Sequence, residues 1–141
     1  MTLVAFAICL VAAAGSAAAQ PRVVLGSASF AAPSGSGWGT ARPRTISNGG
    51  DPSGVVQDIR WSGWGGRTAF ATGESSIFKP NGGYYPRLVT IELHAVALGR
   101  CRPDGPLAYR RLYVREPSHP GGPLGRWLSW SGAKSLCRFG F

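Results

Sequence analysis

Residues 49–72, GGDPSGVVQDIRWSGWGGRTAFAT, decide the fold of this 141-residue chain. They open with turn chemistry, because Gly adopts positive φ, Asp forms Asx-turns and Pro fixes its own φ. Residues 55–61 then alternate, which predicts a strand with one buried face. The apolar members of that face are Val55, Ile59 and Trp61. A Ser-Gly turn, a second tryptophan and a short strand over residues 67–72 follow, so the stretch predicts two strands joined by a tryptophan-bearing corner.

Alternating segments outside this unit predict further strands. The clearest covers residues 87–98, which are apolar on much of both faces and form a central strand. Residues 107–115 form the next one, and the turn between the two makes them an antiparallel hairpin. Weaker candidates are residues 23–25, 75–79 and 126–130, with a turn of helix near 133–136 as an alternative. The sequence therefore predicts an all-β domain, a small antiparallel sandwich or barrel of about six to eight short strands.

The N-terminal residues have the layout of a secretory signal peptide over residues 1–19. An apolar run over residues 3–14 is followed by small residues before Gln20, although no Lys or Arg precedes the run. The alternative is an uncleaved N-terminal anchor, but the run is shorter than the roughly 20 residues that span a bilayer. We expect residues 20–141 to form a single secreted β domain with no transmembrane span after cleavage. About 120 residues are enough for one real core.

The cysteines predict one disulfide. Cys9 leaves with the signal peptide, so Cys101 and Cys137 remain as an even pair in an exported chain. Closing a loop of about 37 residues would constrain the unfolded state by roughly 3–4 kcal/mol. The alternative is a nucleophilic or metal-binding thiol, but no CxxC or Cys/His cluster accompanies the pair. The sequence predicts no metal and no cofactor.

The chain is strongly basic, with a formal net charge of +9 from 15 Lys and Arg against 6 Asp and Glu. Five arginines would cluster if the hairpin forms, namely Arg100, Arg102, Arg110, Arg111 and Arg115. Strand alternation sends Arg110 to the face opposite Arg111 and Arg115. A basic secreted protein binds anionic cell-envelope polymers, lipid head groups or nucleic acid through counterion release, whereas solubility and codon bias are the alternative explanation. No nucleic-acid fold signature is present, so we expect no sequence-specific nucleic-acid binding.

A tryptophan pattern occurs twice, as Arg60-Trp61-x-x-Trp64-x-Gly66 and as Arg126-Trp127-x-x-Trp130-x-Gly132. No other positions repeat around it, so we interpret the recurrence as coincidence rather than duplication. Exposed Trp pairs would form a stacking platform for a polysaccharide, whereas a Trp in a Gly-rich corner usually fills the core of a small β domain. The candidate ligand-binding residues are Trp61, Trp64, Trp127, Trp130, Arg111 and Arg115.

Two groups of residues carry a resemblance. They are Gly50-Asp51-Pro52-Ser53-Gly54 with Val56, Ile59, Trp61, Trp64-Gly65-Gly66, Ala69 and Ala71, and the later Leu98-Gly99-x-Cys101 with Leu107-Ala108-Tyr109. Together they resemble a pattern of small secreted actinobacterial proteins of unknown function, over residues 37–113. The resemblance implies secretion, but it brings no activity, cofactor or catalytic residue.

Catalytic material is sparse. Glu92 and His94 are two positions apart on one strand face, where they could share a site or a metal, although a surface or hydrogen-bonded pair is the commoner arrangement. No GxSxG, HExxH or P-loop motif occurs, while triads can assemble from distant residues. We therefore predict a non-catalytic binding or interaction module at the cell envelope. The alternatives are a carbohydrate-binding module using the Trp pairs and a small extracellular hydrolase using Glu92 and His94.

Overall fold

The computed structural model describes residues 15, 16, 19 and 21–138. The predicted signal peptide lies almost wholly outside these residues and stays a prediction. In the described part of the chain, no helix combines the length and the apolar character that a membrane crossing requires.

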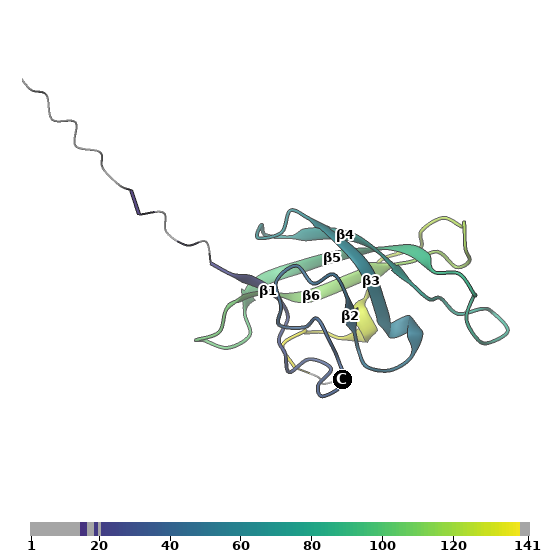
Figure 1. Cartoon of the computed structure of the whole chain (residues 1–141), viewed down its shortest axis with the longest axis horizontal. Coiled ribbons are helices and arrows are strands. Elements are labelled where there is room, and N and C mark those ends of the chain that lie inside the picture. The colour runs from purple at the N-terminus through teal and green to yellow at the C-terminus, as the bar shows by residue number, and fades with distance from the viewer. Residues whose placement is uncertain (1–14, 17–18, 20, 139–141) are drawn as a thin grey trace, which may run out of the picture.

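The described residues form a single curled sheet, which resembles a half-barrel (Figure 1). Its strands are β1 (Val23–Leu25), β2 (Ile46–Ser47), β3 (Val55–Ser62), β4 (Ala69–Ser75), β5 (Val89–Arg100), β6 (Leu107–Arg115) and β7 (Leu128–Ser129). They are ordered β1-β6-β5-β4-β3-β2, and β7 also pairs with β6. Two short 3-10 turns, η1 (Pro52–Gly54) and η2 (Trp130–Gly132), complete the fold. The predicted all-β class and the β5–β6 hairpin are confirmed.

The sheet is mixed rather than purely antiparallel. β1 runs parallel to β6, with Val23 opposite Leu107 and Leu25 opposite Tyr109. Two strands joined by a tight turn must run antiparallel. Most of the chain lies between β1 and β6, so no tight turn joins them and the parallel direction is open to them. The antiparallel prediction is therefore wrong for this one pair.

The phase of β3 differs from the prediction. Val56 and Ile59 are buried, whereas Val55 is only half-buried. Asp58 has a φ of 51°, and the register with β4 shifts between Gln57 and Arg60. This bulge adds a residue to one strand, so the simple alternation changes phase within it.

Other strands begin or end at residues that differ from the prediction. The second predicted strand was expected to end before Gly73, but β4 continues to Ser75, and Gly73 lies where a Cβ would come within 2.6 Å of the Val56 side chain. The candidate strand 75–79 otherwise contributes only an isolated bridge from Phe78 to Tyr84. The candidate 126–130 contains the two-residue β7, and β2 was not predicted at all.

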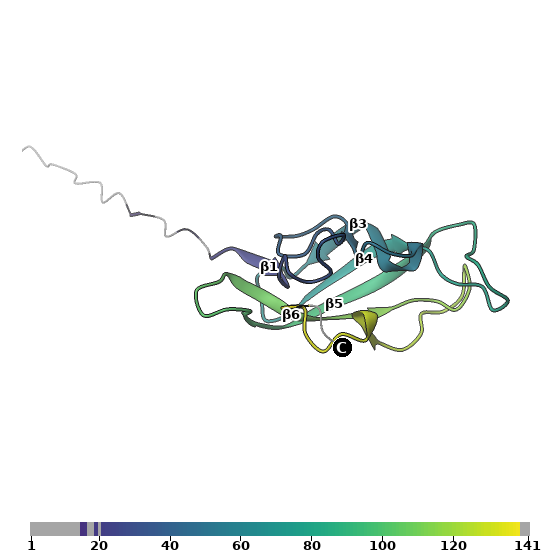
Figure 2. The ribbon, with the colours of Figure 1, turned by 90° about the horizontal axis from the view of Figure 1, so that it is seen from below.

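The sheet curls so that its β3–β4 part lies opposite its β5–β6 part (Figure 2), and buried side chains from both parts belong to one hydrophobic core. Tyr109 is fully buried at 0% exposure, and its hydroxyl donates to the Gly66 carbonyl at 2.7 Å and accepts from the Gly65 amide at 3.0 Å. Other core side chains come from every part of the domain, including Leu25, Phe30, Trp38, Ile46, Ile91, Leu93, Leu112, Trp130 and Leu136. Tyr109 thus ties the tryptophan corner to the centre of the sheet.

The C-terminal tail is fixed against the edge of β6. The predicted disulfide joins Cys101 to Cys137 with a Cα separation of 5.1 Å, which confirms that prediction. Beside it, the Leu136 amide donates to the Arg110 carbonyl at 2.8 Å, and the Ser27 amide donates to the Leu136 carbonyl at 3.0 Å. The tail therefore covers backbone groups between the points where β1 and β7 pair with β6.

Candidate functional site

The first tryptophan pair forms a structural corner. The indole nitrogen of Trp61 donates to the Pro43 carbonyl at 2.9 Å, and that of Trp64 donates to the Val23 carbonyl at 3.3 Å. The two rings meet edge to face, with centroids 4.8 Å apart and planes at 67°. Both rings are half-buried and pack on the core, so they do not offer two coplanar faces to a sugar.

The second pair is split between the two faces of the sheet. Trp130 is 4% exposed, packs near Trp38 and donates from its indole nitrogen to the Asn48 side-chain oxygen at 3.0 Å. Trp127 is half-buried, and its ring lies beneath Arg115, whose guanidinium carbon is 4.7 Å from the ring centroid. Ligand stacking on these four rings stays a prediction. Neither Trp61 with Trp64 nor Trp127 with Trp130 forms a pair of coplanar exposed rings that would support it.

Trp127 and Arg115 belong to a cluster of side chains on the outer face, which we call the outer cluster. Its members are Phe70, Glu92, His94, Arg115 and Trp127. Arg115 pairs with the Glu92 carboxylate through two nitrogens at 2.5 and 2.6 Å. His94 stacks on Phe70 with centroids 4.0 Å apart and planes at 8°, and its centroid lies 5.7 Å from that of Trp127. Charged and aromatic groups thus satisfy one another across three strands.

The same cluster accounts for the two residues considered for hydrolysis. The Glu92 carboxylate is occupied by Arg115, while His94 is surrounded by rings, and burial lowers the pKa of its imidazole. The Nε2 atom of His94 is buried without a hydrogen-bond partner in the described structure. Among the residues that the structure describes, no group of three or more His, Cys, Asp or Glu side chains is arranged to hold a metal ion. The outer cluster therefore gives the hydrolase hypothesis no acid–base pair.

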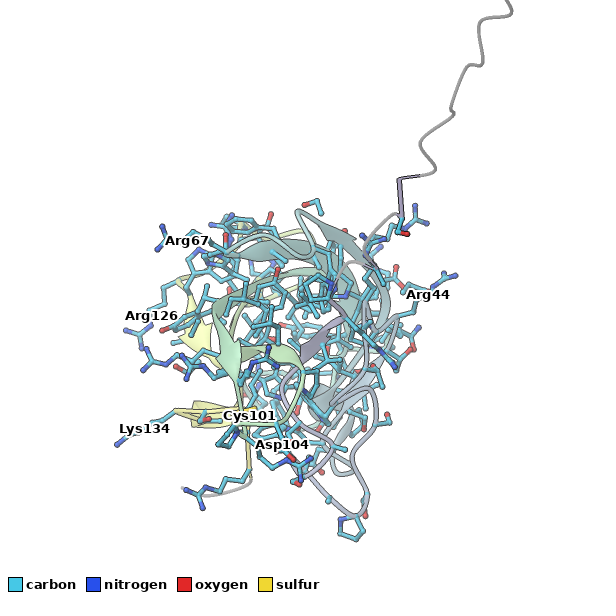
Figure 3. The ribbon with its side chains drawn as sticks, turned by 90° about the vertical axis from the view of Figure 1, so that its left-hand side faces the viewer. Arg44, Arg67, Cys101, Asp104, Arg126 and Lys134 are labelled. Atoms are coloured by element: carbon cyan, nitrogen blue, oxygen red, sulfur yellow. A yellow bond between two sulfur atoms is a disulfide. The ribbon has the colours of Figure 1, made fainter. Side chains whose placement is uncertain are left out.

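A basic depression forms at the disulfide. It measures about 280 Å³ and is lined by four cations, Arg100, Arg110, Arg111 and Lys134, together with Ala97, Ser135 and both cystine residues. Figure 3 shows Lys134 reaching into solvent on the side of the molecule where Cys101 lies. We call this feature the basic depression. Lys134 was not a predicted site residue, because only the disulfide brings the tail beside the hairpin.

Arg110 and Arg111 line the basic depression together, which corrects the prediction that alternation separates them. The flanking Tyr109 and Leu112 are both buried, so two consecutive exposed residues interrupt the alternation of β6. Opposite them, Ala97 has a φ of 58°, and its carbonyl accepts from Arg110 Nε at 3.1 Å. A residue in the left-handed region locally changes the direction of a strand, which lets both arginines face solvent.

Gly99 makes room for the Arg110 guanidinium. A Cβ built at Gly99 would lie 2.8 Å from the Arg110 Cζ, which is closer than real contacts allow. Arg100, one residue further, donates to the Gly105 carbonyl within the hairpin turn. The backbone of the hairpin thus positions two of the four cations.

The cations of the basic depression have no carboxylate partner in the described structure. The ion pairs of the described structure lie outside the depression and join Arg44 to Asp58 at 3.9 Å and Arg115 to Glu92 at 2.5 Å. Arg115, which was predicted to cluster with Arg111, is therefore neutralised in the outer cluster instead. Four unpaired positive charges around one depression attract polyanions and repel cations.

No family model, no curated protein and no solved structure matches this chain. The resemblance to small secreted actinobacterial proteins stays a prediction. A fold alone does not define a function, so function has to be inferred from the basic depression and its neighbours.

Proposed function

We propose that the protein is a non-catalytic binding module that holds an anionic polymer of the cell envelope in the basic depression. The observation that carries this proposal is the convergence of Arg100, Arg110, Arg111 and Lys134 on one depression without a described carboxylate partner. The net charge of +9 adds a long-range attraction for any polyanion.

The geometry suits repeated phosphate or carboxylate groups. Arginine presents a planar fork of donors that matches either group, whereas lysine acts as a mobile point charge. The disulfide and the Leu136–Arg110 backbone bond hold the tail and the hairpin together, so the four cations are close together before the ligand arrives. Preorganised charges lower the entropic cost of binding.

Secretion is part of the proposal and is supported by the disulfide. A disulfide persists in oxidising environments outside the cytoplasm, which agrees with a signal peptide over residues 1–19. Carbohydrate recognition through the tryptophans is the weaker alternative, because Trp130 is buried and Trp61 and Trp64 meet edge to face.

Retention on purified cell wall at rising salt tests the proposal. We expect the oxidised protein to be retained at low ionic strength and released progressively as salt increases, because counterion release drives polyanion binding. Arg110→Gln/Arg111→Gln should elute at lower salt than the wild-type protein. Absence of retention at low salt, or retention that does not depend on salt, would contradict an electrostatic binding module.

A further inference from the structure

A second concave feature lies between η1 and η2. The two turns lie next to each other in Figure 1, η1 in blue and η2 in yellow, and Asn48 forms hydrogen bonds with residues of both. The space between them is a cleft of about 590 Å³, lined from η1, the end of β4, β5, β6, β7 and η2. Its volume falls in the range of small-molecule sites, about 300–1,000 Å³. We call it the mouth cleft.

The floor of the mouth cleft is apolar. Ile91 and Trp130 are buried there, and Val114 packs beside them against the core. Two large hydrophobic side chains stay exposed at its rim, Phe78 at 55% and Leu128 at 48%. A ligand that covers exposed apolar side chains of this size removes their surface from water, which favours binding. The apolar floor distinguishes the mouth cleft from the basic depression.

The two lips of the mouth cleft are joined by hydrogen bonds. Asn48 accepts from the Trp130 indole at 3.0 Å and donates to the Ser131 hydroxyl at 2.5 Å. The backbone amide of Asn48 also donates to the Gly54 carbonyl, at the end of η1, at 3.0 Å. These contacts hold η1 and η2 at a fixed separation, so the cleft exists before a ligand enters it.

The charges that line the mouth cleft are Asp51, Arg115, Glu116 and Arg126. Arg115 is engaged by Glu92 on the outer face. Glu116 forms no ion pair in the described structure, although cations outnumber carboxylates in this chain. Burial raises the pKa of the Glu116 carboxyl. Glu116 is exposed at the rim of the cleft, and neither Arg115 nor Arg126 forms an ion pair with it in the described structure, so its carboxylate is open to a cationic ligand.

We propose that the mouth cleft binds a small organic amine, whose apolar body covers Ile91, Val114 and Trp130 and whose ammonium group pairs with Glu116. Asp51 adds a second negative charge on the η1 lip. This site is separate from the basic depression and selects the opposite charge. It does not depend on polyanion binding, so either proposal can fail while the other stands.

Three probes with the same apolar body test the charge preference, namely 2-phenylethylamine, 2-phenylethanol and 3-phenylpropionate. They are titrated into the protein produced from the full chain, and binding is followed by amide chemical shifts. We expect the amine to bind about tenfold more tightly than the alcohol and the carboxylate to bind most weakly, because one charge-assisted hydrogen bond supplies a factor of this order. The largest shifts should fall on Gly54, Ile91 and Ser131.

Two variants separate the role of Glu116 from a general effect of charge. Glu116→Gln should reduce amine affinity to that of the alcohol, whereas Asp104→Asn, in the hairpin turn outside the cleft, should leave it unchanged. Equal binding of amine and alcohol, tighter binding of the carboxylate, shifts that map elsewhere, or no binding of any probe would each overturn the proposal.

The pH dependence supplies a further readout. Because the folded pKa of Glu116 is raised, its carboxylate costs stability at neutral pH, and this cost is relieved as pH falls through the folded pKa. Glu116→Gln should therefore raise the Tm at pH 7 but not at low pH, while it removes amine binding. Amine binding to the wild-type protein should weaken over the same fall in pH, because Glu116 then loses the charge that pairs with the ammonium group. The other charged residues that line the cleft are Asp51, Arg115 and Arg126. A variant that lowers the Tm at pH 7, or amine binding that strengthens in acid, would contradict this account.

Discussion

The two copies of the RWxxWxG pattern have different structures. At residues 60–66 the two indoles meet edge to face, and Trp64 also meets the Tyr109 ring edge to face. At residues 126–132 the indoles are separated, with Trp127 on the outer face and Trp130 in the core. Residues three apart in an extended strand point to opposite faces, which is the arrangement of the second copy. The same spacing therefore does not indicate the same site.

A backbone turn explains the difference. In the first copy Gly63 has a φ of 69°, and the chain turns back before Trp64. The equivalent position in the second copy is Ser129, which has φ −64° and ψ 134° and stays extended within β7. The residue directly before the second tryptophan, Gly63 or Ser129, thus decides whether the two rings pair or separate.

Replacing the buried tryptophan of the second copy should have the largest effect. Trp130→Ala removes a core side chain and leaves the Asn48 amide oxygen without its donor, so we expect a loss of about 3–5 kcal/mol in the free energy of unfolding. Trp127→Ala, at the half-buried ring, should cost about 1 kcal/mol. Urea unfolding followed by circular dichroism measures both. Equal losses would contradict the assignment of the two rings to different environments.

The first copy is most sensitive at its link to Tyr109. Tyr109→Phe removes the hydroxyl that bridges Gly65 and Gly66, and it should cost about 2 kcal/mol because both backbone groups lose a partner. Tyr113→Phe, on the neighbouring outer-face position of β6, is the matched control and should change stability by less than about 0.5 kcal/mol. If the two substitutions cost the same, the corner is not anchored through Tyr109.

Exchanging the residues between the tryptophans tests the turn directly. Gly63→Ser should cost about 1–2 kcal/mol, because an L side chain must adopt a positive φ there. A Cβ at Gly63 would meet only the Thr68 carbonyl at 3.5 Å, so sterics add little. Ser129→Gly should cost about 0.5–1 kcal/mol, through strand entropy alone. A neutral Gly63→Ser variant would show that the turn does not require glycine.

The smallest expected effect is a pH dependence of stability at the outer cluster. Of the four tryptophans in the two patterns, this cluster contains Trp127. The folded pKa of His94 lies below its ordinary value of 6.5, so the unfolded chain binds a proton first as pH falls. Stability should therefore decrease below about pH 6.5 and be unaffected above it. His94→Phe should remove this component, whereas His119→Gln, in an exposed loop, should preserve it. The opposite sign, with greater stability in acid, would contradict a neutral stacked imidazole.

Local patterns predicted the β5–β6 hairpin and the disulfide, because long alternation and an even cysteine pair are local or compositional signals. The phase of β3 was not predictable, since a bulge at Asp58 leaves no simple sequence signature. The two-residue β2 and the parallel pairing of β1 depend on tertiary contacts. Within the candidate site, Arg110 was assigned to the wrong face because alternation breaks opposite Ala97. Lys134 joins the site only through the folded tail.

The arginines that begin the two patterns provide a control for the proposed function. Arg60 and Arg126 are both exposed, and neither lines the basic depression. Arg60→Gln/Arg126→Gln therefore removes the same net charge as Arg110→Gln/Arg111→Gln from outside that site.

The affinity of these two double variants for inorganic polyphosphate, titrated at several salt concentrations, tests the central claim most directly. The Arg110/Arg111 variant should lose at least about tenfold in affinity at low salt and show a shallower salt dependence, because fewer counterions are released. The Arg60/Arg126 variant should bind nearly as the wild-type protein does. Equal losses in the two variants would mean that net charge alone binds the polymer, and the basic depression would not be its site.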